Sequence, residues 1–138
     1  MKVKQISVFL ENSTGRIASL TKTLKDAGVS LRALSIADTA DCGILRIITN
    51  DCDKALSVLN NAKFVTKVTD VLAVKIQDEV GSIHDVMELF VNNNINIEYL
   101  YASFEKGENS TVIIFKVENL EQGLKVLKDN NYNSDNLF

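Results

Sequence analysis

Two short loops of similar sequence carry the residue types that could hold a small charged molecule. The first reads E-N-S-T-G-R and the second D-E-V-G-S-I, and a helical pattern follows the glycine of each. Asn12 and Gly15 in the first loop correspond to Asp78 and Gly81 in the second. A helix start offers unpaired N–H groups to a carboxylate, and an Asn or Asp oxygen accepts from an ammonium. The loops therefore suit a zwitterion such as an amino acid, but a turn glycine with a capping Asn or Asp accounts for the same residues.

No residue pattern indicates catalysis, a metal centre or a cofactor. His84 is the one histidine. It lies off the apolar stripe of its predicted helix, so we expect an exposed position with no zinc site. No serine or cysteine has a histidine placed to activate it. The aspartate pairs, Asp38 with Asp41 and Asp51 with Asp53, fit turn and capping roles. The sequence therefore predicts a protein that is not an enzyme.

The two cysteines are predicted to be reduced thiols without a role. Cys42 falls in the turn of a predicted hairpin, and Cys52 falls at the start of the next helix. A strand of about eight residues at ~3.3 Å each would hold them ~26 Å apart, which is too far for a disulfide.

The two loops belong to a duplicated unit of about 70 residues, longer than the repeats of a solenoid. Gly15 aligns with Gly81 at an offset of 66 residues, and the apolar positions around them coincide. The offset becomes 68 farther on, where Leu45 meets Ile113 and Phe64 meets Tyr132. The extra residues fit in the second hairpin, at 105–110. We therefore expect two domains, at residues 1–70 and 71–138.

Each copy is predicted to run β-α-β-β-α-β, with strands recognised by alternation and helices by their 3.6-residue period. In the first copy we expect strands at 3–10, 29–38, 44–49 and 64–69, and helices at 15–27 and 52–62. In the second we expect strands at 71–77, 95–104, 111–117 and 132–138, and helices at 81–93 and 119–130.

This element order is that of the α+β, ferredoxin-like fold, in which an antiparallel sheet carries two helices on one face. We expect the two copies to pack side by side, because a 70-residue unit alone buries only a thin core. The middle strands are apolar on both faces, as in I-L-R-I-I and V-I-I-F. A sheet with one wet face would alternate cleanly. We therefore expect a second sheet to cover that face, and we predict a homodimer.

The charge balance argues against nucleic acid and membrane partners. The chain has 138 residues and a net charge of −3, and no basic face is evident for phosphate binding. No run of 18 apolar residues occurs, and the N-terminus lacks the apolar core of a signal peptide. We expect a cytoplasmic protein.

Both copies share the pattern [N/D]-x-x-G-[R/S]-I after a strand, followed by a helix and an I-N-I or V-S-L strand opening. This pattern resembles the ACT domain, a small regulatory module that binds amino acids. The segments R-A-L-S-I-A-D-T-A-D-C-G-I-L-R and V-T-D-V-L-A-V-K-I-Q-D are similar to stand-alone tandem ACT proteins. The resemblance covers essentially the whole chain, and it implies two ferredoxin-like ACT domains.

The resemblance also implies a ligand set, bound where two ACT units pack side by side. Contacts in the family come from the loop and helix start of one unit and from the opening of the second strand of its neighbour. Carried over, they are Asn12, Gly15, Arg16 and Ile17 with Ser30, and Asp78, Gly81, Ser82 and Ile83 with Asn96. The family usually has proline before the glycine, whereas this chain has Thr14 and Val80. The two sites also differ, since Asp78 suits an ammonium better than a carboxylate.

The resulting functional prediction is a regulatory protein that binds a small molecule, an amino acid, between its ACT units. An effector that bridges two units would favour one packing over another. We expect no catalytic domain in the chain, so the target would be a separate enzyme in amino-acid metabolism. The alternative is a structural or interaction module of the same fold whose ligand sites are empty or vestigial.

Overall fold

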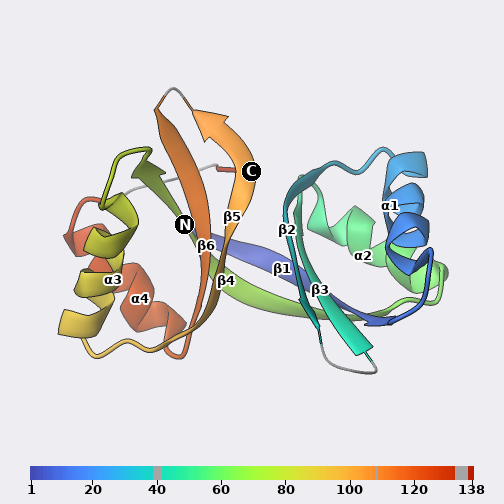
Figure 1. The fold of residues 1–138 in the computed structure, drawn as a ribbon, viewed down its shortest axis with the longest axis horizontal. Coiled ribbons are helices and arrows are strands. Elements are labelled where there is room, and N and C mark those ends of the chain that lie inside the picture. Colours follow the sequence, from blue (N-terminus) through green and yellow to red (C-terminus); the bar gives the residue numbers. More distant parts are fainter. Residues whose placement is uncertain (39–41, 108, 133–136) are drawn as a thin grey trace. The chain divides into compact units, whose positions relative to one another are not determined.

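The described residues form six strands and four helices, arranged as two similar halves (Figure 1). The computed structural model describes residues 1–38, 42–107, 109–132 and 137–138. The elements are β1 (Lys2–Glu11), α1 (Arg16–Asp26), β2 (Leu31–Asp38), β3 (Cys42–Thr49), α2 (Cys52–Asn61), β4 (Val65–Gln77), α3 (Ser82–Asn92), β5 (Ile97–Gly107), β6 (Ser110–Val117) and α4 (Leu120–Asp129). This order matches the predicted repeat, including its four helices.

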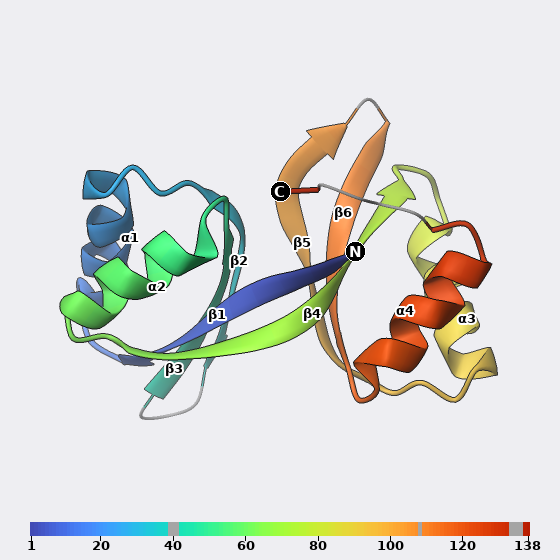
Figure 2. The same cartoon turned by 180° about the vertical axis from the view of Figure 1, so that it is seen from behind.

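One compact unit comprises residues Lys4–Thr69. Its sheet has β3 between β1 and β2, with antiparallel pairs such as Val8 with Leu45 and Leu34 with Ile47. Helices α1 and α2 lie together on one face of this sheet (Figure 2). The apolar alternation of β1 and β3 points toward these helices, because Ile6, Val8, Leu10, Leu45 and Ile47 share a buried cluster with Leu20, Leu24, Ala55 and Leu59.

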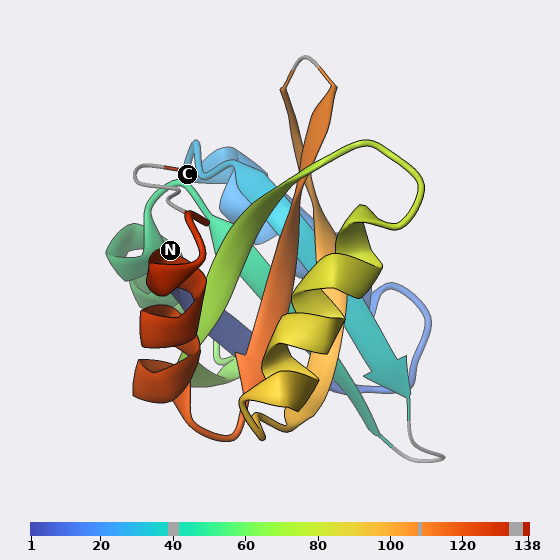
Figure 3. The same cartoon turned by 90° about the vertical axis from the view of Figure 1, so that its left-hand side faces the viewer.

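The other unit comprises Asp70–Phe138 together with Met1–Val3. Here β6 lies between β4 and β5, with pairs such as Val74 with Ile113 and Leu100 with Phe115. Helices α3 and α4 cover one face (Figure 3). Phe90 of α3 meets Phe115 of β6 edge to face, with ring centres 5.4 Å apart, a favoured aromatic geometry.

The strand pattern differs from prediction around residue 70. The predicted strands 64–69 and 71–77 form one strand, β4, of 13 residues. The predicted break is wrong because nothing between Val65 and Gln77 interrupts extended backbone: the stretch holds no glycine or proline. The backbone O of Met1 accepts a hydrogen bond of 2.7 Å from the N–H of Ala73. The start of the chain therefore lies beside the second half of β4.

Two predicted segments fall on residues that the structure does not describe. The hairpin turn at 39–43 includes residues 39–41, and the strand predicted at 132–138 includes residues 133–136. Cys42, which we predicted in that turn, opens β3 instead. Both cysteines are free thiols. The domain boundaries at 1–70 and 71–138 remain our proposal for the two copies of the repeat.

Both faces of the central strands are buried, as their sequence suggested. Ile47 and Phe115 point toward the helices of their own units and are each 0% exposed. Ile48 and Ile114, on the faces away from those helices, are 2% and 0% exposed. These residues are already buried in the single chain, so their burial does not require a second copy, and the homodimer stays a prediction.

Candidate functional site

The loop between β1 and α1 turns sharply through Gly15. The N–H of Ser13 donates to the O of Glu11 at 2.8 Å, and Gly15 then adopts the left-handed conformation, with φ of 88°. A residue with a Cβ is strained at this φ, which explains the glycine. Gly81 repeats the conformation before α3, with φ of 95°. The sequence prediction that these glycines serve sharp turns is confirmed.

The starts of α1 and α3 have no side-chain cap. Asp51 caps α2 as predicted, accepting from the N–H of Lys54, and Asn119 caps α4 by accepting from that of Gln122. Neither α1 nor α3 has such a hydrogen bond at its N-cap glycine. Asn12 and Asp78 therefore do not cap these helices, and the capping interpretation of the two loops is wrong.

The first loop borders a cavity of about 120 Å³ within the unit Lys4–Thr69. Three predicted ligand contacts, Asn12, Arg16 and Ile17, line it together. Gly15 shapes the turn without lining the cavity. The remaining lining residues, which the sequence reasoning missed, are Leu10, Glu11, Ser13, Ile36 and Gly43. Ile36 and Gly43 reach the cavity from β2 and β3, so only the pairing of the strands brings them to the loop.

Arg16 brings a positive charge to this cavity. Its guanidinium carbon lies 4.9 Å from the centre of the Phe64 ring, a cation–π geometry. Phe64 is itself buried, so the ring is a fixed platform for the guanidinium. The Nε atom of Arg16 is buried and has no hydrogen-bond partner among the residues that the structure describes. A planar guanidinium held in this way is suited to a carboxylate.

The apolar side of the cavity combines a buried floor with exposed walls. Leu10 is 2% exposed, whereas Ile17 and Ile36 are 46% and 52% exposed. Leu10 pairs with Gly43 across β1 and β3. A Cβ on Gly43 would lie 3.4 Å from the Cδ1 of Ile36, so the absence of a side chain leaves room beside that residue. Exposed isoleucines beside a cavity are a common feature of ligand grooves.

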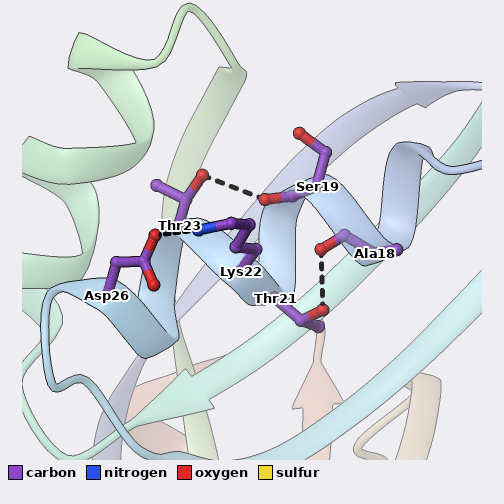
Figure 4. Close-up of polar contacts among 6 residues, drawn as sticks. All are labelled: Ala18, Ser19, Thr21, Lys22, Thr23 and Asp26. Carbon is purple, nitrogen blue, oxygen red and sulfur yellow. Dashed lines mark hydrogen bonds and ion pairs between the residues drawn. The ribbon is translucent and has the colours of Figure 1, made fainter.

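Polar side chains on the later turns of α1 make contacts within the helix (Figure 4). Thr23 donates to the backbone O of Ser19, and Thr21 donates to that of Ala18, both at 3.0 Å. Lys22 pairs with Asp26. Of the α1 residues, only Arg16 and Ile17 in its first turn line the cavity.

Ser30 and Asn96 are not brought to the loop of their own unit. The N–H of Ser30 donates to the Oδ1 of Asn50 at 2.9 Å, and the N–H of Asn50 returns a bond of 3.1 Å to the O of Ser30. Ser30 follows the far end of α1, which at 11 residues is roughly 16 Å long. Asn96 likewise accepts from the N–H of Glu118 at 3.0 Å and lines a different cavity, of about 420 Å³. Within one unit these two residues are separate from the loop sites.

The second loop has different surroundings from the first. A cavity of about 480 Å³ lies beside it in its own unit. Of the predicted contacts Asp78, Gly81, Ser82 and Ile83, only Ser82 lines this cavity. The N–H of Asp78 donates to the O of Asn109 at 2.9 Å, and Ile83 packs against the core. The other lining residues are Lys75, Ile76, Gln77, Glu79, Asp85, Asn131 and Tyr132.

The described residues show no constellation for catalysis. Within them, no group of three His, Cys, Asp or Glu side chains is placed to hold a metal ion. The side chain of His84 is 69% exposed and has its Nε2 3.6 Å from Glu88, so the predicted exposed helix position is confirmed.

Burial raises the pKa of the Cys52 thiol; the charge of Lys4 opposes this shift, and the charges of Asp53 and Asp51 add to it. Among the described helices, none has the length and apolar character needed to cross a membrane.

Comparisons with known proteins agree with the observed fold. The family model for the ACT domain pair matches residues 1–136. A protein of Bacteroides thetaiotaomicron with a crystal structure is 34% identical, over 94% of this chain and 89% of that one, with a TM-score of 0.88.

Two further proteins are more distant. The ligand-free regulatory subunit of aspartate kinase from Thermus thermophilus shares the fold, at 16% identity and a TM-score of 0.63, over 93% of this chain and 92% of that one. The acetolactate synthase small subunit of Buchnera aphidicola subsp. Baizongia pistaciae is 27% identical over 112 residues, which are 80% of this chain and 67% of the relative.

Proposed function

The chain belongs to the family of ACT domain pairs, and on this basis we propose that it is a regulatory protein that binds an amino acid through its ACT units. The observation that carries the proposal is the cavity at the first loop. There an uncapped helix start, the guanidinium of Arg16 and the amide of Asn12 lie beside an apolar wall. These are the groups that a zwitterion with an apolar side chain requires.

In the proposed complex, the ligand's carboxylate lies against Arg16 and the N–H groups at the start of α1. The exposed carboxylate of Glu11 and the amide oxygen of Asn12, both lining the cavity, accept from the ammonium. Ile17 contacts the side chain. For a ligand of about nine heavy atoms we expect a binding free energy of roughly −4 to −8 kcal/mol, or millimolar to micromolar Kd.

We further propose that a neighbouring ACT unit completes each site. The family resemblance assigns this role to the opening of the neighbour's second strand, at Ser30 or Asn96. Both residues are exposed in the chain and separate from the loop of their own unit, which supports a role toward a neighbour. The second loop, with Asp78, Gly81, Ser82 and Ile83, is the proposed counterpart. A homodimer would supply further neighbouring units.

The proposed role is regulation of a separate enzyme in amino-acid metabolism, without catalysis by this chain. The relatives named above are a regulatory subunit of aspartate kinase and a small subunit of acetolactate synthase. A ligand that binds one packing of the ACT units more tightly than another shifts the population toward it, by no more than its difference in affinity. A partner enzyme that binds only one packing of the ACT units would thereby respond to the amino acid.

A thermal-shift series with the twenty amino acids tests the proposal. Binding at about 100 times Kd stabilises by about 2.7 kcal/mol. For a chain of this size that raises Tm by about 5–10 °C. We expect such a rise with a subset of amino acids, absent with the matching amines and alcohols that lack a carboxylate. No rise with any amino acid would favour the alternative, an interaction module with vestigial sites.

A further inference from the structure

The volume of the first cavity indicates the size of the apolar group that this unit can surround by itself. An apolar cavity of about 150 Å³ accommodates benzene, which has six carbon atoms. By proportion, the cavity of about 120 Å³ accommodates roughly four or five. That matches a branched aliphatic side chain. An indole, a phenol or a guanidinium-bearing side chain exceeds this volume.

The residues that line the first cavity are apolar at its buried end and polar at its opening to solvent. Leu10 is buried at the floor, and Ile17 and Ile36 provide apolar walls. The polar lining residues Glu11 and Asn12 are exposed, so their polar groups lie on the solvent side. A charged or hydroxylated side chain that entered the depth would lose hydration without finding partners, at a cost of a few kcal/mol.

Gly43 sets the size of the apolar space. Its backbone lies in β3, opposite Leu10, and its φ is outside the left-handed range. Glycine is therefore not required there for conformation. A Cβ at this position would make ordinary contacts, 3.4 and 3.7 Å from the Cδ1 and Cγ1 of Ile36. What glycine provides at this position is room beside Ile36.

The second unit keeps the apolar residues that correspond to Leu10 and Ile17 but differs at the other positions. Ile36 pairs with Leu45 in the first sheet. The residue that corresponds to Leu45 is Ile113, and it pairs with Ala102, so Ala102 holds the place of Ile36. The smaller side chain removes most of that apolar wall.

Neighbouring positions of the second unit also lose the features that favour an apolar amino acid in the first. Thr111 pairs with Ile76 as Gly43 pairs with Leu10, so a threonine stands where the first unit has a glycine. Ser82 replaces Arg16, which removes the positive charge. The second cavity is lined by two carboxylates, Glu79 and Asp85, and by one cation, Lys75. Its charged side chains sum to −1, whereas Arg16 and Glu11 balance in the first cavity, so the second cavity is less favourable for the carboxylate of an amino acid.

We propose that the cavity at the first loop is selective for amino acids with a branched aliphatic side chain of three or four carbons, and that the chain binds one such ligand, in the unit Lys4–Thr69. The inference rests on the proposed function and deepens it. Leu10, Ile17 and Ile36 recognise the side chain, Gly43 sets its size, and Arg16 holds the carboxylate.

Isothermal titration of the full chain tests both parts of the inference. The probes are L-valine, L-leucine and L-isoleucine, with glycine, L-phenylalanine, L-lysine and L-glutamate as comparisons. We expect one site per chain, with at least tenfold tighter binding of the branched ligands. Two equivalent sites per chain, or tighter binding of a charged or aromatic amino acid, would overturn it while leaving the proposed function intact. An absence of binding by all twenty amino acids would overturn the proposed function as well.

The variant Gly43→Ala adds a test that does not depend on loss of folding. Its methyl group meets ordinary contact distances, so we expect a folded chain with a smaller cavity. The preference should then move at least fivefold from L-leucine toward L-valine. The matched control is Thr111→Ala in the second unit, which should leave both affinities unchanged. An unchanged ratio in Gly43→Ala, or an equal change in Thr111→Ala, would contradict the assignment of the site.

Discussion

The guanidinium carbon of Arg16 lies 4.9 Å from the centre of the Phe64 ring, beside the cavity at the first loop. The ring fixes the position of the charge, while the Nε atom has no hydrogen-bond partner within the described part of the chain. In the corresponding place the second unit has Ser82. The contact between Arg16 and Phe64 is the clearest physical difference between two loops that share the same backbone turn.

Replacing Arg16 should weaken amino-acid binding with little loss of stability. A hydrogen bond to a charged group contributes about 1.5–3 kcal/mol, so we expect Arg16→Met to raise Kd by roughly 10- to 150-fold. The methionine keeps an apolar stem against Phe64. Titration calorimetry measures the change, and Ser82→Ala serves as the matched control in the other unit. Equal affinities of the wild type and Arg16→Met would exclude Arg16 from the site.

Alanine substitutions at Asn12 and Asp51 should distinguish a role in ligand binding from a role in helix capping. Asp51 accepts a hydrogen bond from the N–H of Lys54, so Asp51→Ala should cost about 1 kcal/mol of unfolding free energy. Asn12 makes no cap bond to α1, so Asn12→Ala should leave stability within about 0.5 kcal/mol. It should, however, weaken the amino-acid complex. Urea unfolding and calorimetry on the same two proteins provide the comparison. A stability loss in Asn12→Ala as large as that in Asp51→Ala would restore the capping role.

Gly15 and Gly43 should respond differently to the same substitution. At Gly15 the left-handed φ of 88° makes Gly15→Ala costly by roughly 1–2 kcal/mol, although no atom stands within 4 Å of the added Cβ. At Gly43 an alanine needs no change in φ and should be neutral or slightly stabilising. Denaturant midpoints of the two variants test this contrast. Equal midpoints would show that the turn at Gly15 relaxes without strain.

Cys52 should react slowly with thiol reagents near neutral pH. Burial raises its pKa above the ordinary value of 9.0, so the reactive thiolate forms only at higher pH. A thiol whose pKa is raised by folding also contributes stability that is lost as pH rises from the unfolded value through the folded one. In a Cys42→Ser background, the pH–rate profile with a disulfide reagent should have its midpoint above that of free cysteine. A midpoint at or below that of free cysteine would contradict the burial of this thiol.

The sequence predicted most of the fold because its signals are local and occur twice. Alternation in β1 and in the second half of β4, the helical periods and the glycine before each first helix all stand within short windows, and the repeat supplies each of them twice. The core residues Leu20 and Phe90 follow directly from those periods. The continuity of β4 through Asp70 was misjudged because the duplication suggested a boundary where the backbone simply continues extended.

The site was predicted only in part because two of its eight lining residues come from strands that are distant in sequence. Asn12, Arg16 and Ile17 follow from the loop motif itself. Ile36 and Gly43 reach the cavity through strand register, which no local pattern specifies. The bond from Ala73 to Met1 is long-range in the same way. The residues carried over from the family at Ser30 and Asn96 depend on a neighbouring unit, so the fold of a single unit does not test them.

Backbone amide spectra of the ¹⁵N-labelled chain, recorded during titration with L-valine or L-leucine, test the central claim most directly. The account predicts saturable shifts at the N–H groups of Ser13, Arg16 and Gly43, with one common Kd, while Ser82 and Thr111 stay in place. Spectra in which those three signals do not move, or in which the saturable shifts gather around Ser82 instead, would contradict it.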